Sequence, residues 1–307
     1  MDKVYDVIIL GSGPAGLTAA IYTTRANLKT LIVAGEKWGG QLMLTTLVEN
    51  YPGFPEGIQG PELMERMRKQ AEHHGAEVVE VNFKDGDFTT RPFTVHAGDQ
   101  TYKGNSVIIA TGADTKWLGV PGEQEKIGRG VSSCAPCDAP FFRGKNVIVA
   151  GGGDSAMEEA LVLSRSATQV TIIHRRDQFR ASQIMQDKVK ATPNISVMFN
   201  KTIEEILGDM KVTGVKLKNA QTGETTEMPI DGVFVAIGHN PNSAVFKGID
   251  MDEQGYIKVQ QYFRTNVDGV FVAGDVHDAQ YRQAITAAGF GSAAALEAER
   301  WLREQGK

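Results

Sequence analysis

Two segments of the chain repeat the same order of strand, glycine-rich turn and helix. In the first, the apolar run 7–10 precedes Gly-Ser-Gly-Pro-Ala-Gly at 11–16; in the second, the apolar run 147–150 precedes Gly-Gly-Gly-Asp-Ser-Ala at 151–156. An apolar strand that ends in such a turn and enters a helix provides the tight bend, close backbone approach and free amides that a pyrophosphate needs. One glycine pattern alone is a weak signal, because it can be a structural turn, but here each copy has its strand before it and its helix after it.

The two segments also end alike, which indicates a duplicated fold. The runs SVIIATG (106–112) and GVFVAIG (232–238) are apolar strands that close on glycine, each well downstream of its own glycine turn. A third strand of this type, GVFVAGD (269–275), follows the second unit and has no glycine loop of its own. The sequence therefore predicts an α/β fold with two Rossmann-like dinucleotide-binding domains, one inserted in the other.

The simplest topology places the inserted domain in the middle of the chain. Residues 1–113 and 243–307 then form one discontinuous domain, and residues 114–242 form the other. The turn-forming stretches Pro121-Gly122 and HNPN (239–242) lie near the expected crossings. A length of 307 residues suits two domains of ordinary size.

Composition and charge disfavour several classes of protein. The formal net charge is −5 and there is no long basic run, which disfavours a nucleic-acid partner. No apolar run approaches the ~18 residues of a membrane helix. The opening residues MDKVYDVIILGSG lack the features of a signal peptide. We therefore expect a soluble, cytoplasmic protein that binds neither nucleic acid nor membrane.

The second glycine unit carries a preference for one nicotinamide nucleotide. About twenty residues after its glycines, the strand 169–173 runs into His174, Arg175 and Arg176, with Arg180 about one helical turn further on. A site for the unphosphorylated cofactor usually has Asp or Glu there, whereas arginines suit a 2′-phosphate through charge-assisted hydrogen bonds. This favours NADPH, although the segment could also be a solvated basic start of a helix.

The first glycine unit has features of a second nucleotide site. Glu36 lies twenty residues after Gly16, in the position of a ribose-binding acid, but it could be a solvated surface residue. Gly40 and Gln41 form part of a flexible loop, and Asp275 ends the third strand just before an expected helix start. Two dinucleotide sites in one chain most simply imply an electron relay with a flavin between NADPH and an acceptor.

The only two cysteines of the chain, Cys134 and Cys137, stand close together just before the second glycine turn. A structural zinc site normally needs four ligands, and there is no second cysteine pair. Two buried structural thiols are a further alternative. A redox disulfide fits best, because the short spacing lets the sulfurs bond and the adjacent Asp138 can move the proton that thiolate chemistry requires.

The motifs together resemble the low-molecular-weight NADPH-dependent thioredoxin reductases over residues 5–300. The segments that carry the resemblance are GSGPAG, GGQL, VENYPG, IIATGA, SSCAPCDAPFF, GGGDSAMEEA, IHRRDQFRA, VAIGHNPN and VAGDVHDAQYRQAITAAGFG. The cysteine motif together with the HRRxxxR segment makes it specific. The resemblance implies a homodimer in which a tightly bound FAD passes electrons from NADPH to the disulfide and then to thioredoxin.

The resemblance also implies a role for individual residues. Cys137 resembles the cysteine that receives electrons from the flavin, Cys134 the one that attacks the thioredoxin disulfide, and Asp138 the general acid that protonates the departing thiolate. The residues expected to bind FAD are Gly11, Gly13, Gly16, Glu36, Gly40, Gln41, Asn50, Asp275, Arg282, Gln283 and Ala284. The residues expected to bind NADPH are Gly151, Gly153, Ser155, Ala156, His174, Arg175, Arg176 and Arg180. No metal site is expected.

Three positions depart from the pattern of this family. Ala139 stands where glycine is common, so the backbone beside the acid has less freedom. Pro136 between the cysteines removes an amide that could stabilise a thiolate. Asp154 stands where a neutral asparagine is frequent, and its charge near the pyrophosphate is expected to weaken NADPH binding while favouring the helix start.

Two other functions remain open at this point: an NADPH-dependent flavin reductase or oxidase, and a redox-sensing flavoprotein. In the leading interpretation the cysteines and the second glycine turn share one domain. We therefore expect this domain to rotate about its two crossings, so that the nicotinamide and the disulfide reach the flavin in turn.

Overall fold

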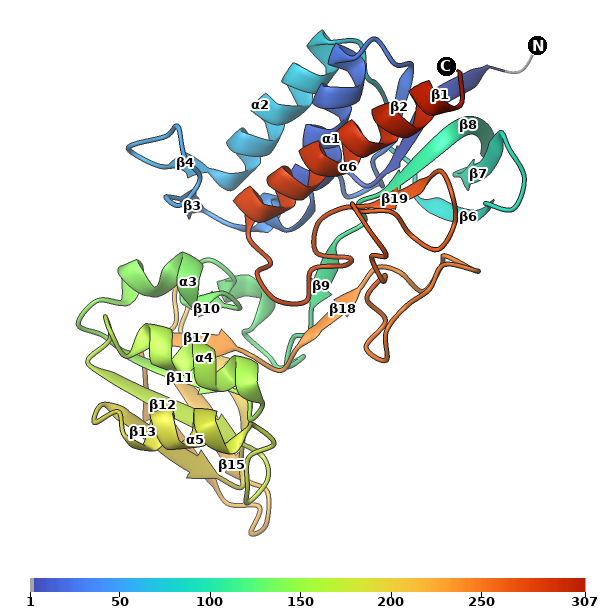
Figure 1. The fold of residues 1–307 in the computed structure, drawn as a ribbon. Helices are drawn as coiled ribbons and strands as arrows, with labels where there is room; N and C mark the ends of the chain where they lie inside the picture. The colour runs from blue at the N-terminus through green and yellow to red at the C-terminus, as the bar shows by residue number, and fades with distance from the viewer. Residues whose placement is uncertain (1–2, 307) are drawn as a thin grey trace. The chain divides into compact units, whose positions relative to one another are not determined.

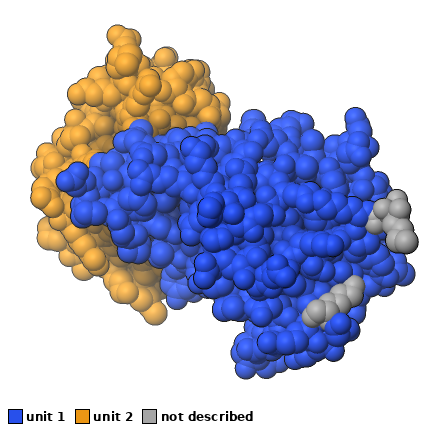
Figure 2. Space-filling view, turned by 90° about the horizontal axis from the view of Figure 1, so that it is seen from above, with its two compact units in different colours: residues 1–114, 240–307 blue, residues 115–239 orange. Residues whose placement is uncertain are grey.

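The computed structural model describes residues 3–306 and forms two compact units. Unit 1 comprises residues 1–114 and 240–307, and unit 2 comprises residues 115–239 (Figure 2). The boundaries expected from the sequence lie one residue before the first division and three residues after the second. The chain passes between the units through β9 (Ala113–Thr115) and β18 (His239–Pro241), which pair with each other.

Unit 1 is built on a seven-stranded sheet in the order β5-β2-β1-β8-β7-β6, with β19 beside β8. Strands β5, β2, β1, β8 and β19 pair in parallel, and β7 and β6 extend the sheet from β8 in antiparallel pairing. The strands are β1 (Val4–Leu10), β2 (Thr30–Val33), β5 (Glu77–Val79), β6 (Phe83–Asp87), β7 (Phe93–Ala97), β8 (Gln100–Ile109) and β19 (Val270–Val272). A short hairpin, β3 (Leu47–Val48) with β4 (Ile58–Gln59), follows the 3-10 helix η1 (Gly40–Leu44).

Three helices cover one face of this sheet: α1 (Pro14–Arg25), α2 (Gly60–His73) and α6 (Ala284–Glu304) (Figure 1). Successive residues of a strand point to opposite faces, so the sheet has two cores. Val7 and Ile9 pack in one cluster with side chains of these helices, and Ile8 and Leu10 pack in a second cluster with β7 and the segment before β19. The apolar run at the start of the chain is therefore buried on both faces, as parallel strands usually are.

Unit 2 repeats this plan. Its parallel sheet has the order β13-β12-β11-β17-β10, which matches β5-β2-β1-β8-β19 of unit 1, and a separate antiparallel sheet has the order β14-β15-β16. The parallel strands are β10 (Val131–Ser132), β11 (Asn146–Ala150), β12 (Gln169–His174), β13 (Ile195–Phe199) and β17 (Gly232–Val235). The antiparallel strands are β14 (Lys201–Leu207), β15 (Gly214–Asn219) and β16 (Thr225–Pro229).

The helices of unit 2 are short. They are α3 (Ala135–Asp138), α4 (Asp154–Leu163) and α5 (Gln183–Lys190), with the 3-10 turns η2 (Gln124–Lys126) and η3 (Ala139–Phe142) (Figure 1). Both glycine turns lie between a central parallel strand and a helix, as the sequence predicts. The α/β class and the duplicated Rossmann-like arrangement are thus confirmed. Within residues 3–306, no helix is both long and apolar enough to cross a membrane.

Helix α6 packs against α1 through a glycine. A Cβ atom at Gly291 would lie 2.1 Å from the carbonyl oxygen of Ala15, whereas one at Gly289 would meet nothing within 4 Å. The backbones of the two helices therefore approach one another closely only because Gly291 has no side chain.

We expect Gly291→Ala to destabilise the protein by about 1–3 kcal/mol, because the added methyl group must push two backbones apart. Gly289→Ala on the same helix should stabilise it by up to about 1 kcal/mol, because alanine favours a helix over glycine. Urea unfolding of the two variants measures both effects. Equal stability of the two variants would contradict the packing argument.

Candidate functional site

The glycine turn of unit 1 joins β1 to α1 through Gly11, Gly13 and Gly16. Gly11 has φ +113°, and a Cβ there would lie 2.2 Å from the carbonyl oxygen of Ala110. A Cβ at Gly16 would lie 2.1 Å from the carbonyl oxygen of Gly11. These two glycines are therefore required by packing. Gly13, in contrast, is the N-cap of α1, has no neighbour within 4 Å of a Cβ position, and leaves the first amides of the helix approachable.

A second loop of unit 1 comes close to this turn. Ser12 donates a hydrogen bond to the carbonyl oxygen of Ala34 (2.7 Å) and accepts one from the amide of Gly39 (2.9 Å). A Cβ at Gly40 would lie only 3.4 Å from Cα of Gly13. The serine therefore holds the 39–40 loop against the glycine turn. Sequence analysis did not single out Ser12, although its place inside the glycine motif is a signal that could have found it.

Two other residues expected at this site, Glu36 and Gln41, lie after β2 and in η1. Glu36 lies after β2, where its amide donates to Asn82 Oδ1 (3.1 Å) and its side chain is exposed. Gln41 Nε2 donates to Asp114 Oδ1 (3.1 Å). Both residues are thus held by contacts within unit 1 and retain polar groups for a ligand.

Asp275 follows β19 and has an unusual environment. Its Oδ1 is buried and has no hydrogen-bond partner within the described chain. Burial, with a smaller contribution from the charge of Asp278 and opposed by Arg282, raises the pKa of its carboxyl to about 7. A buried carboxyl oxygen without a donor fits a hydroxyl group of a bound dinucleotide, which would supply the missing hydrogen bond. This is the strongest sign that the residues of unit 1 fit FAD.

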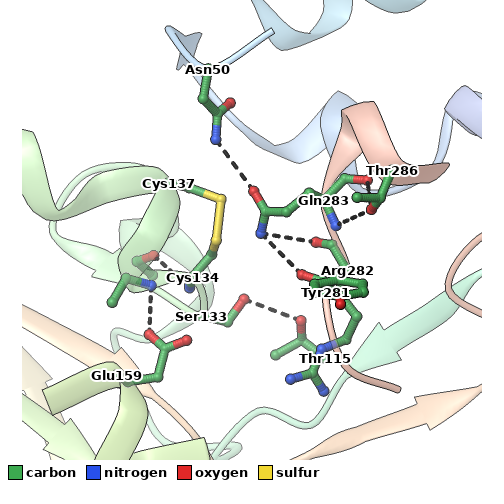
Figure 3. Close-up of a disulfide and its surroundings, with 12 residues drawn as sticks. Asn50, Thr115, Ser133, Cys134, Cys137, Glu159, Tyr281, Arg282, Gln283 and Thr286 are labelled. Carbon is green, nitrogen blue, oxygen red and sulfur yellow. Dashed lines mark hydrogen bonds between the residues drawn. A yellow bond between two sulfur atoms is a disulfide. The ribbon is translucent and has the colours of Figure 1, made fainter. Parts of the chain in front are cut away.

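The loop between Asp275 and α6 presents the remaining expected residues. Asp278 accepts hydrogen bonds from the amides of Gln280, Tyr281 and Arg282, which hold Arg282 at φ +49°. Gln283 is the N-cap of α6 and exchanges hydrogen bonds with Thr286. Asn50 Nδ2 donates to Gln283 Oε1 (3.3 Å), so residues far apart in the sequence meet at the start of α6, where Ala284 is the first helical residue (Figure 3).

Unit 2 contains a cavity of about 510 Å³ at its glycine turn. It is lined by Gly151, Gly152, Gly153, Ser155, His174, Arg175 and Arg180, together with Lys201 and apolar residues that include Leu118, Val120 and Ile237. Arg176 and Ala156, which were also expected at the site, do not line it, and Ala156 is fully buried. Lys201 was missed because it lies on β14, in a different sheet, and nothing local in the sequence links it to the glycine turn.

Three features of this cavity suit a dinucleotide. A Cβ at Gly153, the N-cap of α4, would meet nothing within 4 Å, just as at Gly13. His174 has a buried Nε2 without a hydrogen-bond partner in the described part of the chain. Burial lowers its pKa below the ordinary value, a backbone hydrogen bond with Gln178 opposes this effect, and the charges of three nearby arginines (Arg175, Arg176 and Arg180) add to the lowering, which favours the neutral ring. Arg175 and Arg180 add positive charge to the wall, and the residues of unit 2 therefore fit NADPH.

The carboxylate of Asp154 is hydrogen-bonded within unit 2, at the start of α5. Its Oδ1 accepts hydrogen bonds from the amide (2.8 Å) and the hydroxyl group (2.9 Å) of Ser182, the N-cap of α5. The carboxylate therefore stabilises the start of a second helix. This engagement offsets the repulsion that we expect between an aspartate here and a pyrophosphate.

Cys134 and Cys137 form a disulfide across α3, with their Cα atoms 5.3 Å apart (Figure 3). Cys134 is the N-cap of this single-turn helix, and its amide donates to Ser132 Oγ (3.1 Å). Pro136 lies in the first turn, where a helix tolerates a missing amide. Ala139 has φ −51° and ψ −36°, a helical conformation in which a side chain costs nothing, so glycine is not needed there.

Asp138 ends α3 beside the disulfide. Burial raises the pKa of its carboxyl above the ordinary value, and a hydrogen bond with the side chain of Ser132 partly opposes this effect. A carboxyl that holds its proton more tightly is better suited to act as a proton donor than an ordinary aspartate. Within residues 3–306, no group of three or more His, Cys, Asp or Glu residues is arranged to hold a metal ion.

Two dinucleotide-binding folds and a disulfide loop in one chain define an oxidoreductase that moves electrons between a nucleotide cofactor and a disulfide. The family model described as pyridine nucleotide-disulphide oxidoreductase matches residues 5–291. The chain is 54% identical to a thioredoxin reductase of Mycolicibacterium smegmatis over 99% of its own length and 98% of the relative's. It is 51% identical to a bifunctional thioredoxin reductase/thioredoxin of Mycobacterium leprae, covering 99% of this chain and 67% of that protein.

The solved structure of a thioredoxin reductase from Giardia duodenalis matches with a TM-score of 0.94 and 45% identity, over 98% of this chain and 100% of the other. The chain therefore belongs to the pyridine nucleotide-disulphide oxidoreductase family. The family and the fold imply FAD and NADPH as cofactors.

Asp275→Asn is expected to have opposite effects on the apoprotein and on FAD retention. Because the pKa of Asp275 is raised from 3.8 to about 7 in the folded chain, ionising it opposes folding, and stability is lost as the pH rises from about 4 to about 7. Asparagine does not ionise, so the FAD-free variant should match the FAD-free parent near pH 4 and be more stable above pH 7, by about 2 kcal/mol. Urea unfolding at the two pH values measures this difference.

The same variant should lose FAD more readily than the parent protein during gel filtration in dilute urea, because a neutral amide oxygen is a weaker acceptor for the ligand's hydroxyl group than a carboxylate. A stability gain of equal size at both pH values would show that the carboxyl is not the titrating group.

Proposed function

We propose that the protein is an NADPH-dependent thioredoxin-disulfide reductase, with thioredoxin or a thioredoxin-like small protein as its electron acceptor. The observation that carries this proposal is the Cys134–Cys137 disulfide, formed by the only two cysteines of the chain, in the same unit as the arginine-lined cavity. Full-length relatives that are named thioredoxin reductases support it, and so does the relative in which reductase and thioredoxin are fused.

The reaction transfers two electrons from NADPH to a protein disulfide. NADPH and one proton yield NADP⁺, and the disulfide takes up two electrons and two protons to give two thiols. Bound FAD would supply the step that links hydride transfer to thiol chemistry. By the resemblance, Cys137 would receive the electrons that FAD passes on. Cys134 would be the thiol that attacks the partner's disulfide, so that the partner's S–S bond breaks and a mixed disulfide forms. Cys137 then attacks Cys134, which restores the internal disulfide and releases the reduced partner.

Asp138 is the residue we assign to proton transfer in this sequence. When the partner's thiolate leaves, the carboxyl group gives it a proton. The raised pKa of Asp138 supports this role, because a carboxyl with an ordinary pKa would hold almost no proton at pH 7.

The two cofactors are assigned to the two glycine turns. FAD is assigned to unit 1, at Gly11, Gly13, Gly16 and the start of α6, with Asp275 as acceptor for one of its hydroxyl groups. NADPH is assigned to the cavity of unit 2, with its 2′-phosphate at Arg175 and Arg180. Lys201, on the wall of the same cavity, adds a third positive charge that sequence analysis did not identify.

We further propose that unit 2 rotates about β9 and β18 during turnover. One unit carries both the nicotinamide cavity and the disulfide, and the FAD residues belong to the other. A rotation would let the two groups use the same face of the flavin in turn. We also propose a cytoplasmic homodimer, supported by the resemblance and by exposed apolar side chains on α1 and α6, namely Tyr22, Ile285 and Leu296.

Cys134→Ser and Cys137→Ser should each lower thioredoxin reduction by on the order of 10³-fold or more, because either change removes the disulfide that carries the electrons. Both variants should keep FAD, since the cysteines lie outside the unit assigned to it. A coupled assay with NADPH, thioredoxin and a colorimetric disulfide measures turnover. A flavin reductase or oxidase would keep its NADPH consumption in both variants, and substantial reduction of thioredoxin by either one would refute the proposal.

The double variant Arg175→Ala/Arg180→Ala should raise the KM for NADPH by about 10- to 100-fold, because charge-assisted hydrogen bonds to the 2′-phosphate are lost. The KM for NADH should change by less than about threefold, since NADH has no such phosphate. Lys190→Ala, which removes an exposed charge at the end of α5, is the matched control. Equal increases for both nucleotides would remove the support for the phosphate assignment.

A further inference from the structure

Glu159 makes a contact with the disulfide loop that the proposed reaction does not explain. It lies on α4, and its Oε2 accepts a hydrogen bond from the amide of Ala135 at 2.5 Å (Figure 3). This amide belongs to the peptide bond that follows Cys134. Ala135 is fully buried, and Cys134 as N-cap makes no side-chain hydrogen bond to cap α3. A carboxylate from a neighbouring helix therefore caps the disulfide turn at the cysteine we assign to attack the partner.

The charged groups on the elements packed around α3 are few. Asp138 lies on α3 itself, and burial favours its neutral form. Arg143 and Lys145 follow η3, where the Lys145 ammonium lies over the Phe142 ring. Helix α4 carries Asp154, which is engaged with Ser182, and Glu158, which is exposed. Glu159, in contrast, is hydrogen-bonded to the backbone that joins the two cysteines.

We propose that Glu159 is a positioning residue that anchors the Cys134 turn to α4 and disfavours the thiolate form of Cys134 in the reduced enzyme. An amide next to a cysteine can stabilise a thiolate, but this amide is already engaged by a carboxylate. A negative charge so close also opposes a second one on the sulfur. A thiolate formed against this resistance is the stronger nucleophile, because nucleophilicity rises with basicity. Glu159 thus lowers the fraction of Cys134 that is ionised and raises the nucleophilicity of the thiolate that does form.

This inference deepens the proposed function, in which Cys134 attacks the partner's disulfide. In that step the Cys134 thiolate bonds to one partner sulfur, the partner's S–S bond breaks, and the departing thiolate takes a proton. Glu159 does not touch the reacting atoms. It acts through the Ala135 peptide, so its effect must appear in the titration of the thiol even when no partner and no nucleotide are present.

The test uses the full-length protein in a Cys137→Ser background, where Cys134 is the only thiol left in the chain. The rate of alkylation by iodoacetamide is followed by mass spectrometry from pH 5 to pH 10, with Glu159 intact or replaced in Glu159→Gln. Glutamine keeps an oxygen that accepts the Ala135 hydrogen bond but has no charge. We expect the midpoint of the pH profile to fall by about 0.5–1 pH unit, which corresponds to roughly three- to tenfold more thiolate below the midpoint.

Glu158→Gln is the matched control, because it removes the same charge from the next residue of the same helix. Its profile should coincide with that of the parent within about 0.2 pH unit, since an exposed charge is screened by solvent. Glu159→Ala, which removes the acceptor as well, should also shift the midpoint downward. An unchanged or raised midpoint in Glu159→Gln would overturn the proposal, and so would an equal shift in Glu158→Gln. Neither NADPH nor thioredoxin is used in this test. An unshifted midpoint would therefore leave the proposed function intact, and a failure to reduce thioredoxin would leave the measured shift of the midpoint intact.

Discussion

The close approach of backbones at the glycine turns is the constraint on which both units depend. A Cβ at Gly11 would lie 2.2 Å from the carbonyl oxygen of Ala110, and one at Gly151 would lie 2.4 Å from that of Ala236. Each carbonyl belongs to the residue that follows the neighbouring parallel strand, β8 or β17. The same contact therefore recurs at equivalent places in the two sheets. It brings the first turn of a helix against the ends of two strands, where a dinucleotide can bind.

The two sites built on these turns share a second property: each has a buried polar side-chain atom that lacks a hydrogen-bond partner in the described chain. The pKa of Asp275 is raised and that of His174 is lowered, in both cases chiefly by burial, and each side chain has an atom without a hydrogen-bond partner in the described chain. Such groups are costly in the folded chain and become favourable when a ligand supplies the partner. The protein is therefore expected to be markedly more stable with its cofactors bound than without them.

The sequence predicts those features of the molecule that are formed by residues close together in the chain. The glycine turns, the strands that flank them and the arginines after β12 follow from patterns within some thirty residues, because strand, turn and helix are adjacent in the chain. The contacts between distant segments were not predictable in this way. Lys201 reaches the cavity from another sheet, Glu159 reaches the disulfide loop from the next helix, and Ser182 engages Asp154 across twenty-eight positions. Each of these depends on tertiary packing, and a single sequence shows no pairing between such positions.

The central claim is that electrons from NADPH reach the Cys134–Cys137 pair, and the most direct measurement counts thiols during an anaerobic titration. The purified protein with bound FAD is treated with NADPH in steps below one equivalent per chain, quenched in denaturant with a thiol-alkylating reagent, and analysed by mass spectrometry. The account predicts that two alkyl groups appear per NADPH oxidised, one on Cys134 and one on Cys137. Oxidation of NADPH and bleaching of the flavin without the appearance of these thiols would contradict it.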